Sequence, residues 1–252
     1  MAHQLRCRSV LITGSSRGIG LGLVRGLLAA CPAPDFVFAT CRYPEKAQVE
    51  PFFRDRNRFL SLTPDVVSES SIKKVVKEVE DIVGDKGLNC LVNNAGINVV
   101  ATLEEVTAET MLRIYETNTV AQLMVTKAFL PLLRKAAQQS TGMGCHRAAV
   151  VNMSSISASM ELVQADDFRM VYPYRIAKTA LNMITRCLAV DLEPDGILCI
   201  SLHPGWIETD MGGSLAPLKV QEAIPGILSV LARLSEKDNG RFLNGQGGTL
   251  PW

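Results

Sequence analysis

The chain has 252 residues, of which 47% are hydrophobic and 20% are charged, and its formal net charge is +1. This balance is typical of a globular protein and excludes a disordered chain, and the small net charge excludes a basic field that would attract nucleic acid or anionic lipid. No run of about 18 apolar residues predicts a membrane helix, and the N-terminus lacks the apolar stretch of a signal peptide. The seven cysteines include no C-x-x-C pair, which argues against a zinc site or a disulfide framework. We therefore expect a soluble, cytoplasmic protein that binds no nucleic acid, membrane or metal.

A glycine-rich turn follows the first predicted strand, residues 10–12, and leads into a predicted helix over residues 18–30. Its glycines, Gly14, Gly18 and Gly20, are spaced G-x-x-x-G-x-G. Glycine lets the chain turn sharply and lets a ligand approach the backbone, while the free N–H groups and the helix dipole favour an anion. The turn therefore indicates a pyrophosphate site, although a glycine-rich turn that binds nothing has the same local pattern.

Short apolar runs then alternate with amphipathic stretches along the chain. Strands are predicted over residues 36–40, 59–62, 88–92, 148–153, 197–202 and 242–243. Helices are predicted over residues 72–83, 103–137 with a break near Pro131, 173–191, and 220–234 with a bend or interruption at Pro225-Gly226. Strands that are apolar on both faces and alternate with helices predict an α/β fold, a Rossmann-like doubly wound parallel sheet with helices on both faces.

We expect one domain over residues 1–252, because no linker or repeat divides the sequence. In a doubly wound sheet the ligand crevice lies at the carboxyl ends of the strands. Residues 8–150 would then form the cofactor half, and residues 156–172 and 205–235 would shape the substrate side of the crevice.

Tyr174 and Lys178 form a second signal, because residues four apart share one face of a helix. A free tyrosine has a pKa of about 10, and a nearby ammonium lowers that pKa by stabilising the phenolate. Such tuning suits general acid–base catalysis. An isolated Y-x-x-x-K is more often a solvated helix face, and the neighbouring Tyr172 has Ile176, not a lysine, four residues on.

Polar residues end two of the predicted strands at the edge where ligands bind. Ser154-Ser155 closes the fifth strand, directly before the helix of Tyr174, and residues 93–96 (NNAG) close the fourth. A serine hydroxyl at this edge could hold a substrate carbonyl beside Tyr174, although serine at a strand end is commonly a turn or cap residue.

Taken together, these segments resemble the short-chain dehydrogenase/reductase family over nearly the whole chain. The matching motifs are TGxxxGxG at residues 13–20, NNAG at residues 93–96, Asn118 in TNT, YxxxK at residues 174–178 and PG at residues 204–205. The resemblance implies an enzyme with a nicotinamide cofactor, and family members commonly form homodimers through the two helices that hold Asn118 and Tyr174.

The resemblance also implies the catalytic residues Asn118, Ser155, Tyr174 and Lys178. Tyr174 would protonate the carbonyl oxygen, Lys178 would lower the tyrosine pKa and bind the nicotinamide ribose, and Ser155 would orient the carbonyl. Asn118 would kink its helix and hold a water of a proton relay. Ser155 lies 19 residues before Tyr174, whereas the family commonly has about a dozen residues between the two. The register therefore leaves Ser154 open as the alternative to Ser155, and we expect the extra residues 161–171 to form a loop beside the substrate pocket.

The choice of cofactor follows from the end of the second predicted strand. Enzymes for NAD commonly place Asp or Glu there to bind the ribose 2′-hydroxyl, whereas this chain has Thr40, Cys41 and Arg42. Arg42, and Arg17 in the glycine turn, suit a 2′-phosphate, which favours NADP(H); the alternative is that both are solvated surface arginines. Asp65 resembles the aspartate near the adenine ring, although a simple role at the start of the next helix fits equally.

The full predicted cofactor-binding set is Gly14, Ser16, Arg17, Gly18, Ile19, Gly20, Arg42, Asp65, Asn94, Ala95, Gly96, Tyr174, Lys178, Pro204, Gly205, Ile207 and Thr209.

Within the family, the closer resemblance is to the sniffer and C-factor-like carbonyl reductases, on residues 39–42 (ATCR), 172–175 (YPYR), 203–213 (HPGWIETDMGG) and 250–252 (LPW). It implies an NADPH-dependent reductase of small ketones, aldehydes or quinones. Two alternatives stay open: an NADP-binding regulatory or signalling protein with little turnover, and an NAD-dependent alcohol dehydrogenase. His203 is expected to be a packed residue at the end of a strand.

Overall fold

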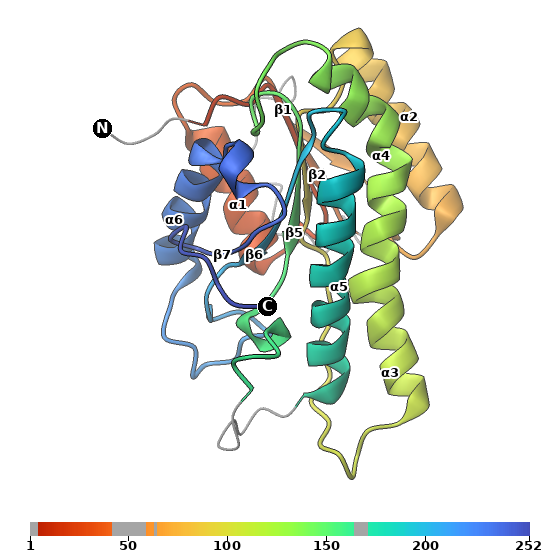
Figure 1. The fold of residues 1–252 in the computed structure, drawn as a ribbon, viewed down its shortest axis with the longest axis vertical. Helices are drawn as coiled ribbons and strands as arrows, with labels where there is room; N and C mark the ends of the chain where they lie inside the picture. The colour runs from red at the N-terminus through yellow and green to blue at the C-terminus, as the bar shows by residue number, and fades with distance from the viewer. Residues whose placement is uncertain (1–4, 42–58, 63–64, 164–170) are drawn as a thin grey trace.

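A single seven-stranded parallel sheet organises the protein in the computed structural model, which describes residues 5–41, 59–62, 65–163 and 171–252 (Figure 1). The strands lie in the order β3-β2-β1-β4-β5-β6-β7. Their bounds are β1 Ser9–Ile12, β2 Phe36–Thr40, β3 Phe59–Leu62, β4 Cys90–Asn93, β5 Ala149–Met153, β6 Leu198–His203 and β7 Phe242–Asn244. The order reverses between β1 and β4, and such a switch point is where doubly wound sheets bind ligands.

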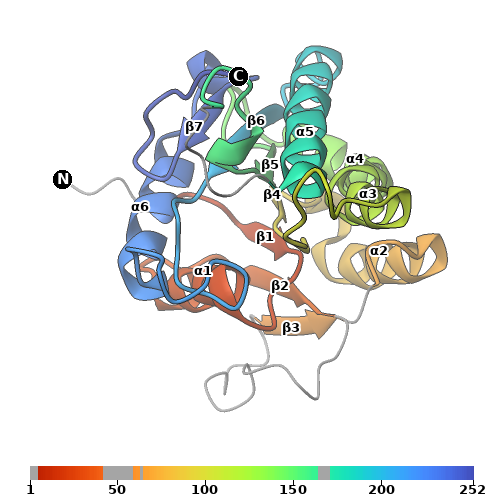
Figure 2. The same cartoon turned by 90° about the horizontal axis from the view of Figure 1, so that it is seen from below.

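Helices cover both faces of this sheet (Figure 2). Two of them, α1 and α6, pack together on one face, and α2, α4 and α5 cover the other. The bounds are α1 Gly18–Ala29, α2 Glu69–Val83, α3 Ala108–Tyr115, α4 Ala121–Ala137, α5 Tyr172–Asp191 and α6 Val220–Arg233. The predicted doubly wound α/β sheet is therefore confirmed.

The core lies in two layers because each central strand is buried on both faces. Alternate residues of β1 show this directly: Val10 and Ile12 pack towards α1 and α6, whereas Leu11 packs towards α2 and α4. All three are fully buried. This two-sided burial explains why the strands are continuous apolar runs in the sequence instead of alternating ones.

The helix that was predicted over residues 103–137 is interrupted elsewhere than at Pro131. Pro131 lies inside α4 on its exposed side, where water can solvate the carbonyl that loses its N–H partner. The interruption is instead a π-helical turn, Glu116–Val120, between α3 and α4. The proline at position 225 likewise lies inside α6, which continues through it.

Two further features bear on the predictions from composition. Among the described residues, the structure contains no disulfide bond. In the part of the chain that the structure describes, every helix is too short or too polar to cross a membrane.

Gly84 and Gly87 give a matched test of how tightly the chain packs before β4. Both have positive φ angles, 56° and 67°, but a Cβ on Gly84 meets nothing within 4 Å, whereas one on Gly87 lies 2.2 Å from the Leu132 carbonyl oxygen. We expect Gly84→Ala to cost about 1 kcal/mol of the free energy of unfolding, from backbone strain alone. Gly87→Ala should cost about 3 kcal/mol or more, because the α4 backbone must also move. Urea unfolding of the two variants measures the difference, and equal losses would contradict it.

Candidate active site

The glycine turn joins β1 to α1 in the shape that an anion site requires. Gly14 and Gly18 have φ angles of 68° and 57°, which favour glycine. A Cβ on Gly14 would lie 2.8 Å from the Cα of Ala95, so a side chain there would push the two loops apart. Helix α1 begins without a side-chain cap at Arg17 and without an acidic residue in its first turn. The N–H groups of that turn therefore keep their capacity to bind a negatively charged ligand.

The segment after β4 supports this turn from the side. The Asn94 side-chain amide donates to the carbonyls of Thr13 at 2.8 Å and Gly14 at 3.1 Å, and the Thr13 hydroxyl accepts from the backbone N–H groups of Asn94 and Ala95 at 2.9 Å. A Cβ on Gly20 would lie 2.4 Å from the Gly14 carbonyl oxygen and 2.6 Å from Asn94 Nδ2. The motifs at residues 13–20 and 93–96, far apart in the sequence, thus form one rigid unit.

Tyr174 and Lys178 lie one turn apart near the start of α5. The Lys178 side chain is 3% exposed, and its Nζ donates to the Met153 carbonyl at 2.7 Å, at the end of β5. The same Nζ lies 5.7 Å from the centroid of the Tyr174 ring. Burial lowers the pKa of Lys178 to about 8, because desolvation disfavours the ammonium.

The pKa of Tyr174 departs from that of a free tyrosine. Surrounding protein desolvates the phenol and raises its pKa to about 12, and a hydrogen bond with the Ser155 side chain offsets this only in part. Desolvation and the Ser155 hydrogen bond account for this shift, so the expectation that Lys178 lowers the tyrosine pKa stays a prediction. With this pKa, Tyr174 is protonated at neutral pH and can act as a proton donor.

The two serines that follow β5 have different partners. The Ser154 hydroxyl is buried and donates to Asn182 Oδ1 on α5 at 2.7 Å. The Ser155 hydroxyl accepts from the Ser157 N–H at 3.2 Å and interacts with Tyr174. Ser154 thus bonds into the protein, whereas Ser155 is the serine that the structure brings to the tyrosine.

Asn118 lies in the π-helical turn between α3 and α4. Its Oδ1 accepts from the Ile97 N–H at 2.9 Å and its Nδ2 donates to the Ile97 carbonyl at 2.8 Å. A Cβ on Gly96 would lie 3.2 Å from Asn118 Oδ1 and 3.8 Å from Lys178 Nζ, so the loop after β4 runs between the two side chains. A widened turn with a buried polar side chain is a frequent feature of functional sites.

The segment after β6 reaches over the glycine turn. Gly205 turns with a φ angle of 102° after Pro204, and Ile207 then forms a bridge with Leu218. The side chain of Thr209 lies close to Gly18: a Cβ built on Gly18 would be 3.2 Å from the methyl carbon of Thr209. Thr209 therefore lies against the glycine turn, and the predicted cofactor residues Pro204, Gly205 and Ile207 precede it on the same segment.

Three further residues of the predicted cofactor site are the arginines Arg17 and Arg42 and the carboxylate Asp65. Arg17 forms an exposed ion pair with Asp210, so it is not a free surface arginine. Arg42 lies outside the residues that the structure describes. The Asp65 carboxylate accepts from the Val67 N–H at 3.2 Å, next to the start of α2, so the helix-start alternative has a visible basis.

Sequence reasoning missed Asp210 and Ile97. No local pattern could pair Arg17 with a residue 193 positions away, and Ile97 acts through its backbone, which no side-chain motif reports. The only signal in the sequence was position, because Ile97 directly follows the NNAG motif and Asp210 lies five residues after the PG motif.

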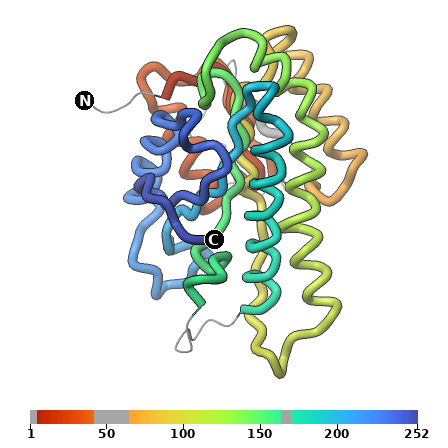
Figure 3. Tube along the Cα trace, in the orientation of Figure 1, coloured from red at the N-terminus to blue at the C-terminus, as the bar shows by residue number. Residues whose placement is uncertain are grey.

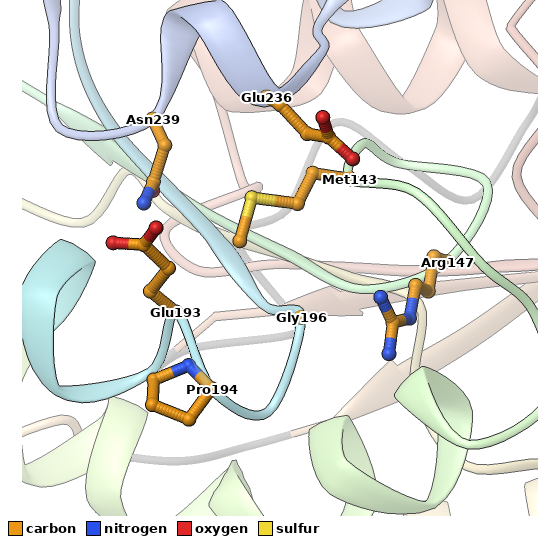
Figure 4. Close-up of a pocket in the computed structure, with 7 residues that line it drawn as sticks. All are labelled: Met143, Arg147, Glu193, Pro194, Gly196, Glu236 and Asn239. Atoms are coloured by element: carbon orange, nitrogen blue, oxygen red, sulfur yellow. The ribbon is translucent and has the colours of Figure 1, made fainter.

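A hollow of about 440 Å³ lies at the opposite edge of the sheet (Figure 4). It is lined by Met143, Arg147, Glu193, Pro194, Gly196, Glu236 and Asn239. These residues come just before β5, β6 and β7, at the amino ends of the strands. The hollow is therefore separate from the crevice of Tyr174. Among the described residues, no group of three or more His, Cys, Asp or Glu is placed to hold a metal ion.

The chain belongs to the short-chain dehydrogenase family, since the family model described as short chain dehydrogenase matches residues 8–219.

Among solved structures, the chain is similar to the carbonyl reductase Sniffer of D. melanogaster, with 42% sequence identity and a TM-score of 0.93, over 98% of this chain and 100% of the other. It is equally similar to the NADPH-bound carbonyl reductase from chicken fatty liver, with 42% identity and a TM-score of 0.96, over 100% of this chain and 96% of the other. The C-signal of Myxococcus xanthus is 34% identical over 166 residues, which is 66% of this chain and 93% of that protein.

His203, at the end of β6, makes the stability depend on pH. Its Nδ1 is buried without a partner among the described residues, and burial lowers its pKa to about 4. Between about pH 6.5 and pH 4, His203 is protonated in the unfolded chain but neutral in the folded protein. The free energy of unfolding therefore falls as the pH falls. We expect the free energy of unfolding to fall by about 2 kcal/mol between pH 7 and pH 5 because of His203, and His203→Gln should remove this decrease. Urea unfolding of both proteins at the two pH values tests this, and parallel pH dependences would contradict it.

Proposed function

We propose that the protein is an NADPH-dependent carbonyl reductase that converts small ketones, aldehydes or quinones into alcohols. The observation that carries the proposal is the meeting of Ser155, Tyr174 and Lys178 at the carboxyl edge of the sheet, beside the glycine turn. Two similar structures are described as carbonyl reductases, one of them with NADPH bound, which supports the same assignment. The odd number and wide spacing of the seven cysteines favour a reducing compartment, the cytoplasm.

The glycine turn fits the pyrophosphate of such a cofactor. Its positive φ angles and the uncapped first turn of α1 present N–H groups to an anion. In the proposal, residues 14–20 hold the pyrophosphate, Arg17 and Arg42 hold the 2′-phosphate, Asp65 lies near the adenine, and Lys178 holds the nicotinamide ribose. The remaining predicted residues border the cofactor on either side; they are Asn94, Ala95, Gly96, Pro204, Gly205, Ile207 and Thr209. NADPH, when bound, supplies the hydride for the carbonyl carbon.

Protein side chains supply the proton for the carbonyl oxygen. The Ser155 hydroxyl orients the carbonyl towards the Tyr174 phenol, whose O–H bond breaks as the proton moves to the substrate oxygen. The raised pKa of Tyr174 keeps that proton in place until the carbonyl oxygen gains negative charge. The phenolate that remains is then stabilised by the Lys178 ammonium and reprotonated from the side of Lys178 and Asn118.

The rest of the chain is assigned by its position around this crevice. In the proposal, residues 8–150 form the cofactor half, and residues 156–172 and 205–235 shape the substrate side. Residues 42–58 and 63–64, and residues 164–170 of the expected loop over residues 161–171, lie outside the part of the chain that the structure describes. A homodimer through the outer faces of α3, α4 and α5 is part of the proposal, because Leu112, Met183 and Val190 expose apolar surface there.

A second candidate is an NADP-binding signalling protein with little turnover, which the similarity to C-signal favours. Tight NADPH binding without turnover of a broad carbonyl panel would support this candidate. An NAD-dependent alcohol dehydrogenase, the third possibility, predicts equal or better binding of NADH.

Replacing Tyr174 by Phe tests the proton donor. We expect Tyr174→Phe to lower kcat for carbonyl reduction about 10²- to 10⁴-fold, because the phenol is the acid, while the Kd of NADPH changes less than about twofold. Tyr115→Phe is the matched control and should leave kcat unchanged, since Tyr115 lies 40% exposed at the end of α3, outside the predicted site. The absorbance of NADPH follows turnover, and unchanged turnover in Tyr174→Phe would exclude this mechanism.

The arginines set the preference for NADPH. We expect Arg42→Ala to weaken NADPH binding about 10- to 100-fold, with little effect on NADH, because a charged hydrogen bond to the 2′-phosphate is lost. Asp210→Asn should instead strengthen NADPH binding about two- to fivefold, because it releases Arg17 from an exposed ion pair.

Fluorescence titration with each nucleotide measures these constants. Glu208→Gln is the control for a general charge effect, since its carboxylate pairs with Lys219 and not with Arg17. If both nucleotides changed equally in Arg42→Ala, the assignment of the 2′-phosphate site would be wrong.

A further inference from the structure

The segment after β7 folds back across its own strand and carries Trp252 to the substrate side of the sheet. Leu243 and Thr249 form an antiparallel bridge, and the Leu250 N–H donates to the Phe242 carbonyl at 2.8 Å. The ring of Trp252 then stacks on the ring of Phe242, with 5.6 Å between the ring centroids and an angle of 24° between the planes. Phe242 is fully buried in β7, so the Trp252 ring rests on a fixed surface.

The backbone of Trp252 binds the segment that follows β5. Its carbonyl oxygen accepts from the N–H groups of Met160 at 3.0 Å and Glu161 at 3.2 Å, and from the Ser159 hydroxyl at 3.3 Å. The Ser159 hydroxyl in turn accepts from the Leu162 N–H at 3.3 Å. The tail and this segment lie side by side in the tube view, where the C-terminus ends next to the turn after β5 (Figure 3).

This same segment begins at Ser155. A short 3₁₀ turn, Ile156–Ala158, joins Ser155 to Ser159, and the Thr179 hydroxyl of α5 donates to the Ala158 carbonyl at 2.9 Å. The turn is thus held by α5 on one side and by Trp252 on the other. Because Ser159 is only 1% exposed, its contact with Trp252 is shielded from water, which makes it costly to break.

We propose that Trp252 is a positioning residue for carbonyl substrates. Its ring, fixed on Phe242, places the carbonyl oxygen that anchors residues 159–161, and this anchor holds the turn that presents the Ser155 hydroxyl to Tyr174. The inference rests on the proposed carbonyl reductase function and adds to it a residue outside the predicted catalytic set. The glycine turn and the Arg17–Asp210 pair make no part of this contact, so Trp252 acts on the carbonyl and not on NADPH.

The test compares Trp252→Ala, which removes the stacked ring, with Trp252→Phe, which keeps an aromatic ring on Phe242. We expect Trp252→Ala to raise KM for the carbonyl substrate about tenfold, with kcat within about threefold and the Kd of NADPH within about twofold of wild type. Trp252→Phe should restore KM to near the wild-type value. Ser159→Ala, which weakens the same anchor from the other partner, should raise KM in the same direction by a smaller factor.

Amide hydrogen exchange provides a readout that does not depend on turnover. The N–H groups of Met160 and Glu161 should exchange about tenfold faster in Trp252→Ala than in wild type and regain protection in Trp252→Phe. If the wild-type protein reduced no carbonyl but the variants showed this exchange pattern, the proposed function would be wrong, while the contact between Trp252 and residues 159–161 would still stand. Unchanged KM and exchange in Trp252→Ala, or an equal weakening of carbonyl and NADPH binding, would overturn the role of Trp252.

Discussion

The hydrogen bond from Lys178 to the Met153 carbonyl is the interaction on which the site depends. It joins the first turns of α5 to the end of β5, so the helix of Tyr174 and the strand end of Ser155 cannot move independently. A buried ammonium is costly, and the fall of its pKa to about 8 reflects that cost. The protein tolerates the desolvation because the carbonyl at the strand end accepts the bond. This buried cation also lies near Gly96, whose loop after β4 runs between Lys178 and Asn118.

Much of this arrangement could be predicted from the sequence, because its parts are local. The glycine turn, the apolar strands and the Y-x-x-x-K spacing are encoded within a few residues each, and a parallel sheet brings the strand ends to one edge. The choice between Ser154 and Ser155 needed the structure, because both end the same strand and only their partners, Asn182 and Tyr174, distinguish them.

Long-range effects were the ones that escaped prediction. Pro131 was expected to break a helix, yet it lies on the exposed side of α4, where its missing N–H does little harm. The sequence also carried no sign of how deeply both groups of the YxxxK motif are buried, and that burial raises the pKa of Tyr174 and lowers the pKa of Lys178. Trp252 accepts a hydrogen bond from Ser159, which lies 93 positions earlier in the chain, and no periodicity of the sequence predicts such a contact.

The π-helical turn at Glu116–Val120 also fixes the spacing of the chain around it. The Ala121 N–H bonds to the Glu116 carbonyl five positions back, one more than in an α-helix. Each helical residue rotates the chain by about 100°, so removing that additional residue would swing every side chain before it by the same angle relative to α4. Asn118 would then turn away from Ile97, and the face that α3 presents to α5 would change as well. The number of residues between these two helices therefore decides which side of α3 packs against α5.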